Sequence, residues 1–161
     1  MTWQDDKAWT DPMLRHVAVL CAPVLFGPAE EEDDRQRNTD LRVIVARDVR
    51  IAVRIRRHHY YRLYREDITV RASRPNGSAT ELRKIMDGWG DYLFYGFANQ
   101  DSTGFLDFAL IDLAVFRVVI RDLWKQRSLQ QYHRRNADGT EFYAFPRALF
   151  VQGIALCKEA A

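Results

Sequence analysis

The chain has 161 residues, of which 47% are hydrophobic and 29% charged. This length fits one domain, 1–161, and the composition excludes a disordered chain, because enough apolar surface is present to build a core. Neither Cys21 nor Cys157 has a second ligand at zinc-finger spacing, so a structural zinc is not expected. The polar, acidic N-terminus and the absence of a bilayer-length apolar stretch predict a cytoplasmic protein without a membrane segment.

Charge is distributed unevenly along the chain. Residues 1–40 contain nine acidic and four basic residues, a formal net charge of −5. Residues 41–74 contain ten arginines and three acidic residues, a formal net charge of +7. Because a planar guanidinium binds phosphate through two parallel hydrogen bonds, an all-arginine basic block predicts a surface that contacts a polyanion.

The N-terminal half predicts one helix followed by a strand-rich segment. The helix begins at Asp11, which can cap it, and Gly27 marks its end, while Pro23 either kinks or stops it. A tight turn at Arg47 and Asp48 predicts that the first two strands form a hairpin. The strands expected in this half are 41–46, 49–57 and 67–72.

The C-terminal half alternates between helices and strands. A helix starting at Ser78 or Thr80 ends near Gly88, and the aromatic strand that follows is expected to be central. The other elements expected are the strands 91–98, 105–111 and 141–145, and the helices 113–125 and 147–158. This order predicts an α/β fold with a central mixed sheet flanked by helices, with a core from about 11 to 145 and a C-terminal helix 147–158.

Alternation in the segment 49–57 is the clearest local signal. Valine and isoleucine occupy every second position, while Arg50, Arg54 and Arg56 share the opposite face with Ala52. The alternative is a solvated sheet face, with the neighbouring tyrosines packed on the core. Clustered arginines favour phosphate contact, and interleaved tyrosines can stack on bases. The residues predicted to bind nucleic acid are Arg50, Arg54, Arg56, Arg57 and Tyr60.

Asp40, in Thr39-Asp40-Leu41, opens a strand, and the strand 51–56, the helix 80–85 and an aromatic strand follow it. In this arrangement, the region 11–145 resembles the PD-(D/E)XK nuclease-like superfamily. Asp40 matches the family aspartate, and the strand 51–56 has the shape of the family's Glu-x-Lys strand. The helix 80–85 and the aromatic strand after it look like those of several phage and bacterial members. The resemblance implies a core of helix, three antiparallel strands, helix and strand, and Mg²⁺-dependent cleavage of phosphodiesters.

The sequence departs from this family at the Glu and Lys positions, which are occupied by Arg54 and Arg56. Arginine cannot ligate a cation, so the active site is either lost or rearranged. In the rearranged form, Asp40 and Glu81 hold Mg²⁺ and Lys84 orients water, because Glu81 and Lys84 are neighbours on one helix face. The alternatives are that Asp40 caps a turn and that Glu81 and Lys84 form a surface ion pair.

The sequence therefore predicts a nucleic-acid-binding protein, with DNA favoured over RNA. In its catalytic form it is a Mg²⁺-dependent endonuclease with Asp40, Glu81 and Lys84 as catalytic residues. The first alternative is an inactive pseudonuclease that binds nucleic acid or protein. The second is a structural or inhibitory partner protein, with a phage origin as one option, whose acidic segment Glu30–Asp34 meets a basic surface. The sequence also leaves open whether the protein binds a protein partner or forms a homodimer.

Overall fold

The computed structural model describes residues 3–28, 41–43 and 49–158, and two β-sheets organise most of this part of the chain. The first sheet has the order β3-β5-β6-β9 and is mixed, because β3 runs parallel to β5 while the other neighbours are antiparallel. The second, β4-β8-β7, is antiparallel. These strands are β3 (Ile51–Arg56), β4 (Asp67–Ser73), β5 (Tyr92–Ala98), β6 (Phe105–Asp112), β7 (His133–Arg135), β8 (Glu141–Pro146) and β9 (Ile154–Lys158).

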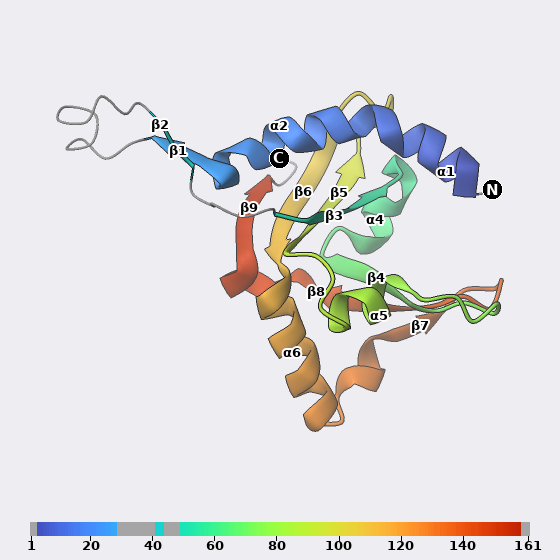
Figure 1. Ribbon diagram of the computed structural model, residues 1–161. Helices are drawn as coiled ribbons and strands as arrows, with labels where there is room; N and C mark the ends of the chain where they lie inside the picture. The colour runs from blue at the N-terminus through green and yellow to red at the C-terminus, as the bar shows by residue number, and fades with distance from the viewer. Residues whose placement is uncertain (1–2, 29–40, 44–48, 159–161) are drawn as a thin grey trace.

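Helices and the second sheet cover the two faces of the first sheet. Figure 1 shows α2 across one face, with the second sheet, α5 and α6 on the other side. The helices and 3-10 turns are α1 (Trp3–Thr10), η1 (Asp11–Met13), α2 (Leu14–Leu25), η2 (His58–Tyr60), α4 (Tyr61–Tyr64), α5 (Glu81–Met86), α6 (Leu113–Lys125), η3 (Leu129–Tyr132) and η4 (Arg147–Gly153). The predicted mixed sheet flanked by helices is confirmed. No helix in the described ranges is long and apolar enough to cross a membrane.

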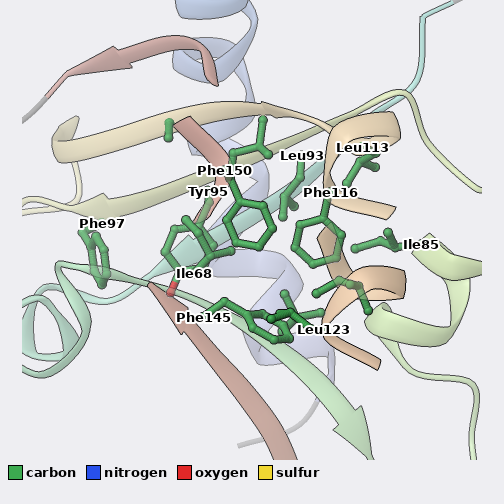
Figure 2. Close-up of a cluster of buried hydrophobic side chains, with 14 residues drawn as sticks. Ile68, Ile85, Leu93, Tyr95, Phe97, Leu113, Phe116, Leu123, Phe145 and Phe150 are labelled. Carbon is green, nitrogen blue, oxygen red and sulfur yellow. The ribbon is translucent and has the colours of Figure 1, made fainter. Parts of the chain in front are cut away.

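The larger hydrophobic core lies between the two sheets and α6 (Figure 2). Phe116 of α6 stacks on Phe150 with ring centroids 4.8 Å apart, and Phe145 of β8 meets both rings edge-on. The hydroxyl groups of Thr69 and Tyr95 share a hydrogen bond of 2.9 Å across this core. Because β5 lies between β3 and β6, the prediction of a central aromatic strand is confirmed.

The alternation predicted along β3 is confirmed. Ile51, Val53 and Ile55 pack against the smaller core, which is formed with α2. Ala52 packs against the larger core instead, so the side chains at even positions face the second sheet. The period of two therefore places Arg54 and Arg56 on the inner side of the sheet, between the layers.

The predicted hairpin between 41–46 and 49–57 is wrong within the described residues. Only Leu41–Val43 of the first strand is described, as β2, and it pairs with β1 (Phe26–Pro28) in a separate two-stranded sheet. β3 pairs in parallel with β5, and β4 belongs to the other sheet, so these segments do not form three consecutive antiparallel strands. Alternation determines which side chains share a face, but it leaves the partner strand undetermined. The turn expected at Arg47 and Asp48 lies outside the described residues.

Both ends of the chain differ from expectation. The first helix begins at Trp3 rather than Asp11, and Pro12 lies in a 3-10 turn between two helical segments. The helix predicted for 147–158 is present only in its first part: Arg147–Gly153 forms the 3-10 helix η4, and β9 then pairs with β6. A side chain at Gly153 would come within 2.8 Å of Val115, so this glycine permits the close approach of η4 to α6. A further strand, His133–Arg135, was not predicted.

A nearly buried ion pair joins the C-terminal segment to the first sheet. The two terminal nitrogens of Arg147 lie near β6: Nη1 donates to both carboxylate oxygens of Asp107, at 2.9 and 2.7 Å, and Nη2 to the carbonyl of Phe108 at 3.4 Å. The Asp107 side chain is only 4% exposed and that of Arg147 13% exposed. The backbone N–H of Arg147 donates to the carbonyl of Glu66. The pair therefore ties η4, β6 and the start of β4 together.

Candidate functional site: an arginine-lined pair of clefts

Two neighbouring clefts open beside β3. The first lies between β3, β4 and α5, and the second between β3, β4, α1 and the turn that joins β7 to β8. The first cleft, of about 510 Å³, and the second, of about 720 Å³, share Arg54, Arg71 and Arg74. The first is further lined by Arg50, Lys84, Glu81 and Trp89, and the second by Arg56, Arg57, Asp6, Asp138, Trp9, Tyr60 and Tyr64. Seven cationic side chains and three carboxylates thus line the two clefts. We call Arg54, Arg56, Arg71 and Arg74 the arginine cluster.

Glu81 is a carboxylate that directly contacts the cluster. It lies in the first turn of α5, and its Oε2 accepts a hydrogen bond of 2.9 Å from Arg54 Nη1 and one of 3.3 Å from the backbone N–H of Arg71. Both side chains of the ion pair are about one-fifth exposed, at 17% and 21%. The surface ion pair considered between Glu81 and Lys84 is therefore not the observed arrangement, because Glu81 pairs with Arg54.

The positive charges of this cluster repel one another in a partly buried place. Burial lowers the pKa of Arg56, and the charge of Arg54 lowers it further. Burial also lowers the pKa of Arg71, followed by repulsion from Arg54 and Arg74. Arginine still remains protonated, so these shifts mean that the folded protein holds mutually repelling charges in a poorly solvated place.

Two buried nitrogens of the cluster lack an acceptor. The Nε atoms of Arg54 and Arg56 are inaccessible to solvent and have no hydrogen-bond partner within the part of the chain that the structure describes. Buried polar groups normally find partners, and exceptions mark either strain or a function. The Nε–H groups of these two arginines are thus buried without an acceptor among the described residues.

Aromatic rings lie beside the guanidinium groups. The guanidinium of Arg56 lies 4.1 Å from the centroid of Tyr60 and 5.6 Å from that of Tyr64. Arg57 lies 4.5 Å from a ring centroid of Trp9 and pairs with Asp6 at 3.9 Å. Such stacking holds the guanidinium planes in place, since a ring face attracts a cation. The tyrosines therefore support the arginines and also border the second cleft.

The first cleft has a more exposed aromatic residue at its rim. Trp89 is 63% exposed, and Arg50 lies 5.9 Å from its ring centroid. The loop that carries Trp89 is held by Arg117, which donates to the carbonyls of Ile85, Trp89 and Gly90 at 2.7 to 3.2 Å. An exposed indole on an anchored loop can contact a ligand without a loss of core packing.

The residues predicted to bind nucleic acid all line one cleft or the other. Arg50 and Arg54 line the first, and Arg54, Arg56, Arg57 and Tyr60 line the second. The sequence-based prediction did not include four other residues that line the clefts: Arg71, Arg74, Trp9 and Trp89. Arg71 and Arg74 belong to the basic block 41–74, but only the packing of β4 beside β3 places them in the clefts.

The predicted catalytic set is brought together only in part. Glu81 and Lys84 line the same cleft, whereas Asp40 lies outside the described residues, as does the acidic segment Glu30–Asp34. Within the described ranges, no three His, Cys, Asp or Glu side chains are grouped so that they could hold a metal ion. The Mg²⁺ site at Asp40 and Glu81 therefore stays a prediction.

Comparison with protein-family models, with curated proteins and with solved structures gives no match for this chain.

Proposed function

We propose that the two clefts bind nucleic acid, chiefly through its phosphates. The observation that carries the proposal is the partly buried arginine cluster, whose guanidinium groups repel one another. Arg74 is its exposed member, and Glu81 forms an ion pair with Arg54. Anionic oxygens would relieve the repulsion and accept hydrogen bonds from the guanidinium groups. The same arrangement disfavours a cationic or neutral apolar ligand, because neither offsets the charge.

The length of the surface and its aromatic residues favour nucleic acid over a single small anion. From Arg50 to Arg57 the chain is extended over roughly 20 Å, at about 3.3 Å per residue. Trp89 borders one cleft, and Trp9 and Tyr60 border the other. Alternating guanidinium groups and ring faces are typical of proteins that track a strand and stack its bases. DNA as the favoured ligand and the cytoplasm as its location stay predictions from the sequence.

Charge removal at the two exposed arginines tests this proposal. Arg50 and Arg74 are exposed, so Arg50→Gln combined with Arg74→Gln should leave the fold intact. We expect the affinity for an oligonucleotide to fall about tenfold, and the slope of log K against log salt concentration to fall by about two, because each lost contact releases one counterion fewer. Fluorescence anisotropy between about 50 and 200 mM salt measures both, with DNA and RNA of one sequence.

A matched variant separates the clefts from general basicity. Arg15→Gln combined with Arg121→Gln removes the same charge from exposed positions that line neither cleft. This control should bind like the unaltered protein. Equal losses in both variants, or no measurable binding at low salt, would eliminate the cleft as a nucleic-acid site.

A Mg²⁺-dependent endonuclease with a PD-(D/E)XK-like fold is the narrower form of the proposal. Glu81 and Lys84 line a common cleft with Arg54, as that form requires. However, the described residues of this cleft supply Glu81 as their one carboxylate, and its Oε2 already accepts from Arg54. Mg²⁺ needs several oxygen ligands, and a neighbouring guanidinium repels it. These residues alone do not fit the ion, so we propose the non-cleaving form, a pseudonuclease.

Glu81→Gln distinguishes the two forms by the sign of its effect. Glutamine keeps an acceptor for Arg54 and for the N–H of Arg71, but it removes the negative charge that competes with phosphate. We expect two- to fivefold tighter oligonucleotide binding, from about 0.4–1 kcal/mol of relieved repulsion at a partly exposed site. Glu66→Gln, at an 82% exposed residue outside the clefts, is the control and should change nothing.

Cleavage is measured on the same proteins. Plasmid DNA and RNA incubated with Mg²⁺ or Mn²⁺ should remain intact with both the unaltered protein and Glu81→Gln. Metal-dependent cleavage that Glu81→Gln abolishes would instead establish the endonuclease form.

A further inference from the structure

The second cleft concentrates more positive charge than one internal phosphate would balance. Five arginines line it, whereas its carboxylates are Asp6 and Asp138. Asp6 pairs with Arg57 near the rim, at 3.9 Å, and Asp138 accepts a hydrogen bond from the backbone N–H of Thr140. Neither carboxylate forms an ion pair with Arg56 or Arg71 within the described part of the chain, although the charge of Arg71, after the hydrogen bonds from Thr140, helps to lower the pKa of Asp138. Of the five arginines, Arg54 already pairs with Glu81. The inner arginines therefore present an excess of charge to a ligand.

A phosphomonoester fits this excess better than a phosphodiester does. An internal phosphodiester carries one negative charge, whereas a terminal phosphomonoester carries about −1.5 to −2 at neutral pH and has three strong acceptor oxygens. Buried arginines that repel one another gain most from the ligand with the larger charge. The lowered pKa values of Arg56 and Arg71 have this repulsion as one of their causes.

The surroundings of the cluster favour the end of a strand as the source of that phosphate. Trp9 and Tyr60 border the second cleft with Arg57 and Arg56 over their rings, so a terminal nucleoside can contact these guanidinium–aromatic pairs. Arg54, Arg71 and Arg74 also line the first cleft, which continues toward Arg50 and Trp89 and can receive the following nucleotides.

We infer that the second cleft recognises the terminal phosphomonoester of a nucleic-acid strand, held by Arg56, Arg71 and Arg74. This inference rests on the proposed nucleic-acid function and specifies its ligand. Arg56 is already oriented by Tyr60 and Tyr64, so it loses little freedom when the phosphate binds.

Three otherwise identical single strands of about 12 nucleotides test the inference: one with a 5′-phosphate, one with a 3′-phosphate and one with neither. We expect one phosphorylated end to bind about tenfold more tightly than the unphosphorylated strand. In Arg56→Met, which keeps an apolar chain on the tyrosines, this preference should fall below about twofold. Arg62→Met, at an exposed residue outside both clefts, should keep the full preference. If Arg56→Met does not fold, Arg74→Gln replaces it and should also reduce the preference.

The outcomes distinguish a failure of the terminal-phosphate site from a failure of nucleic-acid binding as a whole. Equal affinity for all three strands would overturn the terminal site and leave nucleic-acid binding standing. No binding of any strand would overturn both. Inorganic phosphate and a free nucleoside monophosphate serve as competitors, and each should compete much more weakly than the phosphorylated strand. Competition by the free nucleotide at an affinity equal to that of the strand would show that the ligand is a nucleotide, which also overturns the inference.

Discussion

Arg71→Gln is expected to stabilise the free protein and to weaken its binding to oligonucleotides. Arg71 is half-buried on β4, where burial and the charges of Arg54 and Arg74 all lower its pKa. Removing its charge relieves that repulsion, and we expect about 1 kcal/mol of added stability, in the range of changes that remove strain retained for function. A charge-assisted hydrogen bond to phosphate contributes about 1.5–3 kcal/mol, so affinity should fall by about 10- to 100-fold.

Thermal unfolding of the free protein and anisotropy with a labelled oligonucleotide measure the two effects. Arg135→Gln is the matched control, since Arg135 is an exposed arginine of the same sheet that lines neither cleft. It should change neither quantity. A lowered Tm with unchanged affinity would mean that Arg71 stabilises the fold and does not bind the oligonucleotide.

Arg147→Ala should produce the largest loss of stability, about 3–5 kcal/mol. Truncation leaves the Asp107 carboxylate, now 4% exposed, without the guanidinium that donates to both its oxygens. The bond from Arg147 to the carbonyl of Phe108 is lost as well. Since domains are stable by only about 5–15 kcal/mol, this one change removes a large part of the total.

Urea denaturation monitored by tryptophan fluorescence measures the free energy of unfolding. A double variant provides the control: Asp107→Leu combined with Arg147→Met removes both charges and keeps apolar volume, so it should be clearly more stable than Arg147→Ala. A loss below about 1 kcal/mol in Arg147→Ala would contradict the view that a desolvated pair joins η4 to β6.

The sequence was informative where the physical rule acts locally. Helix α6 has the predicted bounds, because its apolar spacing and the cap at Asp112, which accepts from the N–H of Ala114, are both local signals. The end of α5 at Met86, two residues before Gly88, was predicted for the same reason, since the φ of +96° at Gly88 favours glycine just after the helix. The helical prediction for 147–158 was right for the 3-10 helix Arg147–Gly153 and wrong for Ile154–Lys158, because pairing with β6, a distant segment, decides the conformation there.

For the candidate site, the order of residues alone determined that Arg54 and Arg56 share one face of a strand, because side chains alternate with a period of two. It could not determine that β3 pairs with β5 rather than with 41–46, since the partner depends on contacts between distant segments. Only the tertiary structure brings Arg71 close to Arg54. It also makes Glu81 pair with Arg54 rather than with Lys84. Charge interactions depend on distance and solvation, and both are properties of the packed layers rather than of the sequence.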